Sequence, residues 1–504
     1  MGKNLVIDGL PRLGNNKGGV LILSYFIIAV LVTLGAAFVL ISSNESKLAQ
    51  RQQKSIQALY VAEAGIERAL YDLRQDFLSD LSSPSWSDGD INGMALGPDS
   101  SNFYSAGYGS ATINGGSYAV SFKNGADGRG IYVRSIGTVE NISQTIEIYA
   151  KIQSLSPWDN AIFAGAGASG AMVNGNVNIR GSVHILGSGL DSTDYAIDLG
   201  GTAELVGNNY NGLDSALLAK VPALETTVFN GETVQTLNAE LRVKRGIVGL
   251  SGSSSVGEAN ATGNAVKETV NGSFVSDGFG GTQGTGSVHS DNGWSNGYDL
   301  GDAIGFPSLA DPAPADTSIT YQQYLHNNAL VLTNELTSIN PGSSFSYSDA
   351  NGSISMDGSG NLTISGIVYV DGGNDVAFAK QGANKTITYT GTGALLVTGN
   401  ININASLITN GNNSYPNNII GFMTPNSITM NEAQIDIMGL LYAETSVVVQ
   451  KQTDIMGTIV SNYFDMGTNV PSIFQVPETA NNLPPGMIGG NMAWIMNTVS
   501  WRKI

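Results

Sequence analysis

One short acidic stretch has the residue types and the spacing of a metal-binding loop. Asp88, Asp90 and Asn92 occupy alternate positions, Gly93 follows them, and Asp99 stands twelfth from Asp88. Oxygen-bearing side chains at alternate positions, a glycine at the sixth place and an acid at the twelfth are the pattern of a calcium loop. However, the twelfth residue is Asp and not Glu, and the Leu-Gly-Pro before it cannot begin a flanking helix. We therefore interpret the stretch as a solvated acidic turn, with a calcium site as the alternative.

The rest of the sequence offers little that could support catalysis. The chain contains no cysteine, so disulfides and thiolate metal sites are excluded. Its three histidines are far apart, and no zinc-protease, nucleophile-elbow or P-loop motif occurs. No pair of carboxylates has a recognisable glycosidase spacing. A net charge of −18 also argues against nucleic acid as a partner. We therefore expect neither an enzyme nor a nucleic-acid-binding protein.

A membrane anchor is expected near the N-terminus. Residues 20–41 (VLILSYFIIAVLVTLGAAFVLI) carry no charge, and as a helix they would span roughly 30 Å, the thickness of one bilayer core. Lys3, Arg12 and Lys17 precede them, which predicts that residues 1–19 stay in the cytoplasm while the bulk of the chain is exported. A cleaved secretory signal is the alternative. The apolar run is longer than the usual one of about 7–15 residues, so a retained single-pass anchor is favoured.

A second helical pattern continues directly beyond the apolar segment. Apolar residues recur there at intervals of three and four, which predicts one helix from about residue 20 to 81, roughly 90 Å long. An acid interrupts the apolar seam. The seam consists of Ile56, Leu59, Glu63, Ile66, Leu70, Leu73 and Phe77.

These features together resemble the type IV pilin superfamily, and PilX-type minor pilins or pilus assembly proteins in particular. The motifs are the basic leader ending in Lys17, the two glycines after it, the apolar helix, and the phrase AEAGIERAL at 62–70. The resemblance implies that a prepilin peptidase cuts after Gly18 or Gly19, so that Gly19 or Val20 begins the mature chain. It also implies that the freed helix packs among pilin subunits in a filament.

One departure from the pilin pattern bears on the role of the chain. Major pilins carry Glu at the fifth mature position, whereas this chain has Leu23 or Ser24 there. A low-copy or tip subunit is therefore a better match than a repeating major subunit. Glu63 has two interpretations: an exposed acid on an imperfect seam, or a contact to a basic or amide group on another pilin.

The residues after the helix predict a small sheet. Within SQTIEIYAKIQ, Ile146, Ile148, Ala150 and Ile152 alternate with polar residues, as in a half-buried strand. Two similar segments precede it from residue 117 onward. The pilin resemblance implies that such strands form an antiparallel head sheet on the exported half of the helix, so that residues 42–157 make up stem and head.

The remaining residues predict a repetitive β domain. The chain has 64 glycines and only 13% charged residues, which suits short strands joined by tight turns. Glycines begin five similar apolar strands at intervals of 27, 28, 18 and 18 residues, and such periods are typical of a solenoid. These are Gly366, Gly393, Gly421, Gly439 and Gly457. The expected fold class is mainly β with one long N-terminal helix, and a parallel β-helix follows the head. A β-sandwich is the alternative.

We divide this β-rich part into two. Residues 158–350 form a β-rich domain with a Gly/Ser/Asn-rich insert at 251–300 and a helix at 318–336. Residues 351–504 form β-helix coils, and the last segment (MAWIMNTVSWRKI) is expected to cover an open coil end, which would otherwise expose unpaired strand edges.

The sequence thus predicts a minor pilin-like subunit of a type IV pilus or related filament system. It would prime assembly or display an adhesive β-rich domain at the filament tip. Its expected partners are pilin subunits, the prepilin peptidase, the assembly machinery, the membrane, and a surface glycan or protein ligand. The expected location is the inner membrane, with the bulk extracytoplasmic, and then the pilus or cell surface. The alternatives are a membrane-tethered carbohydrate-active β-helix enzyme and a permanently anchored structural protein.

Overall fold

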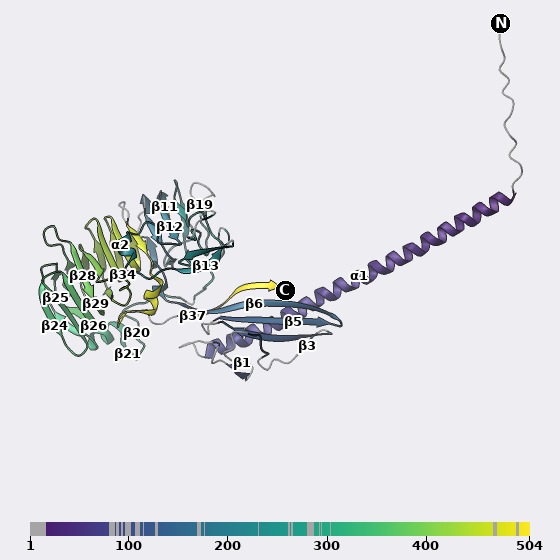
Figure 1. The fold of residues 1–504 in the computed structure, drawn as a ribbon. Helices are drawn as coiled ribbons and strands as arrows, with labels where there is room; N and C mark the ends of the chain where they lie inside the picture. The colour runs from purple at the N-terminus through teal and green to yellow at the C-terminus, as the bar shows by residue number, and fades with distance from the viewer. Residues whose placement is uncertain are drawn as a thin grey trace, which may run out of the picture. The chain divides into compact units, whose positions relative to one another are not determined.

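The fold is mostly β, with one long N-terminal helix (Figure 1). It comes from a computed structural model. The chain divides into two compact units, residues 1–153 with 494–504, and residues 154–493. The structure describes residues 17–79, 86, 90–91, 94–95, 102–105, 111–113, 115–125, 130–168, 173–175, 177–229, 231–260, 263, 266–279, 287–291, 293, 295–302, 304–466, 471–489 and 493–504.

The N-terminal helix, α1 (Lys17–Ser79), runs without a break through the predicted membrane segment and the stem. Its 63 residues correspond to roughly 95 Å. Residues 20–41 make no buried contact within the chain, and by length and hydropathy this part of α1 could cross a membrane. The second half carries the face that packs on the head sheet.

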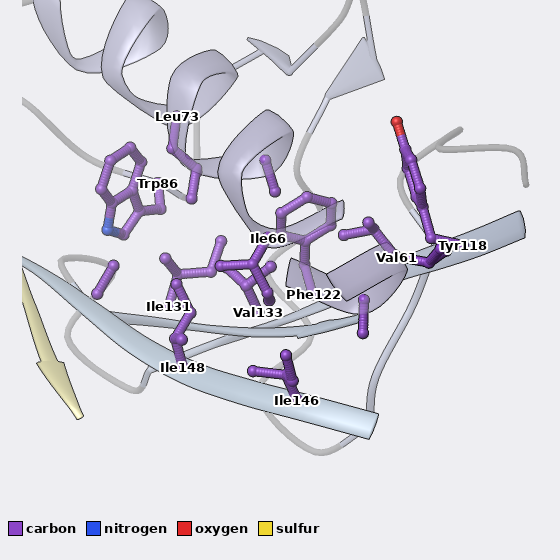
Figure 2. Close-up of a cluster of buried hydrophobic side chains, with 14 of the residues drawn as sticks. Val61, Ile66, Leu73, Trp86, Tyr118, Phe122, Ile131, Val133, Ile146 and Ile148 are labelled. Carbon is purple, nitrogen blue, oxygen red and sulfur yellow. The ribbon is translucent and has the colours of Figure 1, made fainter. Parts of the chain in front are cut away.

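The head is a five-stranded sheet in the order β3-β4-β5-β6-β37. Strands β3 to β6 pair antiparallel with their sequence neighbours, as the sequence predicts. Figure 2 shows the core that this sheet forms with α1, in which Ile66 and Leu73 of the helix meet Phe122, Val133 and Ile148 of the strands. The strands are β3 (Ala111–Ile113), β4 (Gly116–Asn124), β5 (Gly130–Val139), β6 (Ile142–Leu155) and β37 (Ala493–Lys503), with a separate pair β1 (Asp90–Ile91) and β2 (Met94–Ala95).

The C-terminal strand corrects the prediction of a cap on the β-helix. Strand β37 instead completes the head sheet beside β6, where the backbone N–H of Ile504 donates to the carbonyl of Thr145. The Arg502 guanidinium also binds the Glu147 carboxylate on β6. The last segment thereby covers the side of β6 that would otherwise expose unpaired backbone groups, and β37 becomes the edge of the sheet. The whole β-helix is therefore inserted between two neighbouring strands of the head.

The inserted unit is a parallel β-helix with three faces, which confirms the solenoid prediction and excludes the β-sandwich. Each coil contributes a short strand to each face, and strands of successive coils pair in parallel. The exception is the far end of the stack, where residues 344–348 and 352–357 form an antiparallel hairpin that also pairs antiparallel with residues 362–366.

We name the faces A, B and C. Face A contains β22 (Leu330–Thr333), β26 (Asn361–Asp371), β29 (Thr392–Val397), β32 (Ile419–Thr424), β34 (Ile435–Val449), β35 (Thr453–Asp465), β7 (Ile162–Ala168), β10 (Val183–Ile185), β15 (Glu240–Val243) and β18 (Gly272–Val275). Face B contains β23 (Ser338–Ile339), β27 (Val376–Phe378), β30 (Ile401–Ile403), β33 (Ser427–Met430) and the ends of β34, β35 and β7, with β8 (Val173–Gly175), β11 (Tyr195–Gly201) and β16 (Ile247–Leu250) in a separate parallel sheet. Face C contains β24 (Ser344–Ser348), β25 (Gly352–Asp357), β28 (Thr386–Thr390), β31 (Ser406–Thr409), the starts of β26, β34 and β35, β36 (Ser472–Phe474), β9 (Asn178–Arg180), β12 (Glu204–Gly207), β17 (Ser255–Val256) and β19 (Ser287–Val288).

The chain enters this stack in its middle and not at one end. Strand β7 lies between β10 on one side and β35 on the other. From β7 the chain coils outward to β18 and β19, and residues 296–329 then carry it to the far end at β22. From there it coils back until β35 rests against β7. The first and last long strands of the β-helix are therefore neighbours.

The five glycines that mark the predicted repeat lie in strands of successive coils, but one of them is out of register with the others by one residue. Gly366 lies opposite Gly393, and Gly439 lies opposite Gly457. Gly421, in contrast, pairs with Ala394 on one side and with Leu440 on the other. It therefore lies one residue out of register with Gly393 and with Gly439. Backbone pairing in a parallel sheet follows the apolar core positions, and the glycine itself is free to shift.

Several segments differ from their predictions. For residues 251–300 the sequence predicts a long loop or a decorated coil, and their described part has the coil strands β17, β18 and β19. The two parts divided at residue 350, in contrast, belong to one compact unit. The helix predicted at 318–336 is short and ends at Asn327. Strand β22 follows it, and the side chains of Leu330 and Leu332 are buried while those between and after them are less so, as in a strand. The elements outside the coils are α2 (Ser215–Leu218), α3 (Tyr321–Asn327), the hairpin β13 (Glu225–Phe229) and β14 (Glu232–Thr236), the pair β20 (Pro312–Ala313) and β21 (Asp316–Thr320), and the 3-10 turns Pro157–Asp159 and Pro477–Asn481.

Candidate functional sites

Small residues within AEAGIERAL and one turn before it bring the helix and the head sheet close together. Ala58, Ala62 and Gly65 are buried, and the sheet supplies Gly137 opposite the first two. A Cβ at Gly137 would overlap the backbone of Ala58 and Ala62, and a Cβ at Gly65 would overlap the Ser135 side chain. The stem and the sheet therefore pack nearly backbone to backbone, and side chains larger than Ala would separate them.

This packing splits the predicted heptad seam between two faces of α1. Ile66, Leu73 and Phe77 are buried against the head, as predicted. Ile56, at the start of the seam, is 54% exposed, and Leu59, Glu63 and Leu70 are half-buried. The head-facing side is centred on the small residues, so the larger seam residues are turned toward its margin.

A second apolar surface is left on the outer side of the stem. Tyr60, Tyr71 and Leu78 are each more than half exposed there, and Ile56 adds to them. Glu63 lies at the border of this surface, and among the described residues it has no ion-pair partner. We name these five residues the outer stem surface. Exposed apolar residues of this kind on one helix face are typical of a protein contact.

The predicted cleavage residues lie at the very start of α1. Gly18, Gly19 and Val20 follow its first residue, Lys17, and Gly19 and Val20 are exposed. Cleavage at this point stays a prediction. The apolar half of α1 that begins here is exposed throughout, so no described residue of the chain covers it.

The predicted calcium loop falls mostly outside the described residues. This holds for Asp88, Asn92 and Asp99, whereas Asp90 is described as the first residue of β1, whose backbone pairs with Ala95. Over the described part of the chain, no group of three His, Asp or Glu side chains could hold a metal ion.

Face C carries a carboxylate pair that the sequence analysis missed. Asp436 of β34 and Asp454 of β35 lie directly opposite each other on adjacent coils. They line a groove of about 450 Å³, and Asp214, which caps α2, and Lys220 line it as well. Burial raises the pKa of both Asp436 and Asp454, and their proximity to other carboxylates adds to the shift. The signal was the repeat DIMG, which begins at both residues.

The β-helix unit carries all of the net negative charge of the chain. Residues 154–493 contain 28 Asp and Glu against nine Lys and Arg, a net of −19, whereas the rest of the chain has 13 acids and 14 bases. Five of the nine bases form ion pairs between segments of the β-helix. These pairs are Arg180–Glu204, Arg242–Asp299, Lys244–Asp302, Lys267–Asp291 and Lys380–Glu432. The remaining acids therefore dominate its surface.

The helical stem packed on an antiparallel head sheet defines a pilin-like fold. Among solved structures, the competence-associated pilin ComZ from Thermus thermophilus is similar, with a TM-score of 0.52 and 19% sequence identity. The match covers 90% of this chain and 97% of that one, and so includes the β-helix as well as stem and head. At this identity the likeness establishes the fold. No protein-family model matches the chain, and no curated protein matches it.

Proposed function

We propose that this chain is a minor, pilin-like subunit of a type IV pilus or related filament system. The observation that carries the proposal is α1, whose apolar, uncovered first half continues without a break into a stem packed on the head sheet. Such a helix suits the bilayer before assembly and a bundle of pilin helices afterwards. The outer stem surface, with Glu63 at its border, would contact neighbouring pilins there.

Two features favour a low-copy position at or near the filament tip. Position 23 or 24 lacks the acid of major pilins. In addition, two copies side by side would bring together two β-helices of −19 each, and like charges of this size repel over a Debye length of about 8 Å at physiological salt. A single copy at the tip avoids that repulsion. There it would prime assembly or display the β-helix for attachment to a glycan or protein.

The test is the N-terminus of the mature chain. Filaments sheared from cells and the membrane fraction are analysed by mass spectrometry, with a Gly18→Leu/Gly19→Leu variant and a Gly2→Leu control from the same leader. A terminus at Gly19 or Val20 in filaments, lost in the double variant and kept in the control, is the expected result. This result would support the prepilin peptidase and the assembly machinery as partners of the chain. It would also support insertion into the inner membrane before assembly. An intact Met1 found only in membranes would instead favour the permanently anchored protein.

A second candidate function is supported by the groove on face C. The in-register pair Asp436 and Asp454 has raised pKa values, and carboxylates with such pKa values in a groove are frequent in glycan-cleaving sites. The strongly negative β-helix disfavours an acidic polysaccharide, so a neutral one is the better substrate class. New reducing ends from neutral polysaccharides, lost in Asp436→Asn and Asp454→Asn, would support this function. If no neutral polysaccharide yields new reducing ends, the enzyme function is refuted and the proposed pilin-like subunit stands alone.

A further inference from the structure

A pocket of about 300 Å³ opens where residues 304–314 cross the outside of face A. Its walls are mostly apolar, and one carboxylate stands among them. Phe306, Pro312 and Tyr321 line it from the crossing segment and α3, Ile488 lines it from the C-terminal part of the unit, and Asp311 is its charged residue. All of these residues belong to the β-helix unit.

The pocket is held in shape by the way the crossing segment is fastened. Glu444 accepts hydrogen bonds from the Ser308 hydroxyl at 2.7 Å and from the Leu309 backbone N–H at 2.6 Å. The Tyr442 hydroxyl donates to the carbonyl of Pro307 at 2.8 Å. The Phe306 ring stacks on Tyr442, with ring centroids 6.0 Å apart. A site held by so many contacts needs little rearrangement to accept a ligand.

The charge around the pocket is negative and uncompensated. One oxygen of Asp311 accepts a hydrogen bond from the Ser308 backbone N–H at 2.8 Å, and Glu444 lies behind the same segment. Among the described residues, neither carboxylate forms an ion pair with a Lys, Arg or His. None of the described residues that line the pocket is basic, and the unit around it has a net charge of −19.

We propose that this pocket receives a lysine or arginine side chain from a partner protein. The proline, isoleucine and aromatic walls would cover the methylene stem of such a side chain. Its cation would meet the Asp311 carboxylate and the faces of aromatic rings, both of which attract positive charge. An anion is excluded by the surrounding charge, and a purely apolar side chain would leave the Asp311 carboxylate partly desolvated without a partner. The inference is independent of the proposed pilin role.

The experiment compares short peptides that differ in one side chain. Full-length protein in detergent micelles is titrated with acetylated, amidated Gly-Gly-X-Gly-Gly peptides, with X as Lys, Arg or norleucine, and binding is followed by saturation-transfer NMR. Norleucine has the lysine stem without the ammonium group. We expect the Lys and Arg peptides to bind at least about tenfold more tightly than the norleucine peptide.

Two matched variants assign the binding to the pocket. Asp311→Asn keeps the oxygen that accepts from Ser308, so the loop should stay in place while the charge is lost. Asp316→Asn removes a fully exposed charge from the same segment outside the pocket. Binding of the Lys peptide should fall about tenfold in Asp311→Asn and stay unchanged in Asp316→Asn, with equal thermal unfolding in both.

Several results would overturn the proposal. Equal binding of the Lys and norleucine peptides would show that the carboxylate plays no part. Unchanged binding in Asp311→Asn would move the site elsewhere, and no binding at roughly 20 mM peptide would remove it. Butylamine binding as tightly as the Lys peptide would indicate a small-amine site and not a protein-docking site.

Discussion

Replacing Arg502 by Met should loosen the C-terminal strand from the head sheet and leave the β-helix intact. Arg502 is the point at which β37 is tied to β6. Its Nε and Nη2 atoms both donate to Glu147 Oε1, the first over 3.0 Å. Glu147 is itself almost fully buried and also binds Arg134 at 2.7 Å. The substitution therefore removes one of the two cations that satisfy a buried carboxylate.

The size of the effect follows from the exposure of the two partners. Breaking a fully buried ion pair typically costs about 3–5 kcal/mol, and exposed pairs contribute about 0.2–1 kcal/mol. The Glu147 side chain is 3% exposed but the Arg502 side chain is 65% exposed, and Arg134 stays in place. An intermediate loss of about 1–2 kcal/mol is expected for the attachment of β37.

Hydrogen–deuterium exchange measures this loss locally. Amides of β37 and of the β6 edge should exchange roughly 5–30-fold faster in Arg502→Met, whereas amides of the β-helix should not change. Lys503→Met is the control, because the neighbouring lysine forms no ion pair among the described residues. Equal acceleration in both variants, or rates within about twofold of the parent protein in Arg502→Met, would refute the role assigned to the ion pair.

The same ion pairs predict how the head responds to acid. Burial by itself would raise the pKa of Glu147, but the hydrogen bonds and charges of Arg134 and Arg502 outweigh it and lower the pKa below the ordinary value of 4.5. A lowered pKa in the folded state stabilises the fold above the unfolded pKa, and this contribution is lost as the pH falls below about 4.5. Exchange of β37 amides, corrected for the intrinsic pH dependence, should therefore accelerate below that pH in the parent protein and less so in Arg502→Met.

Three further predictions concern packing and charge elsewhere. Gly137→Ala should destabilise the head by roughly 3 kcal/mol or more, because its Cβ would overlap helix backbone, whereas Gly35→Ala, with open space around it, should be neutral in the same thermal melt. Trp158→Phe should lower the free energy of unfolding of the β-helix by about 2–3 kcal/mol in a denaturant titration. The substitution removes the 2.7 Å hydrogen bond from Nε1 to the carbonyl of Ile488 and leaves a void in a buried site. A loss under about 0.5 kcal/mol would contradict this. The double variant Asp436→Asn/Asp454→Asn should stabilise the β-helix at pH 7. The pKa values of both carboxyls are raised in the folded state, so their ionisation opposes folding. The parent protein therefore loses stability as the pH rises through these pKa values, and the variant should lose less. A variant less stable than the parent at pH 7 would refute that reasoning.

The sequence predicted the parts of the fold that depend on residues close together in the chain, namely the apolar helix and the repeated short strands. Residues 20–41 are apolar without interruption, and the β-helix repeats its apolar strands at short intervals, so both could be read from the sequence. The buried side of the stem was harder, because Ala58, Ala62 and Gly65 carry little apolar surface. They are selected by the close approach of Gly137, which lies on a strand far along the chain.

Other features depend on partners that are distant in sequence. The alternation at 146–152 predicts a half-buried strand and gives Glu147 an outward position, but its partner Arg502 is 355 residues away. Nothing near residue 502 indicates a head strand, since an alternating segment can complete any open edge. The groove pair on face C arises in the same way: Asp436 and Asp454 are 18 positions apart and meet only because one coil has that length.

The first and last long strands of the β-helix, β7 and β35, are neighbours, so the whole unit could be removed or replaced as one insertion. Strands β6 and β37 lie side by side in the head, and β7 and β35 lie side by side in the β-helix, so each unit closes on itself at the point where the chain passes between them. Joining residue 153 to residue 494 by a short turn would leave the stem and a five-stranded head sheet. Conversely, coils could be added at either end of the stack without moving the two joints. Lengthening, shortening or exchanging the β-helix would then leave the stem and the head sheet unchanged.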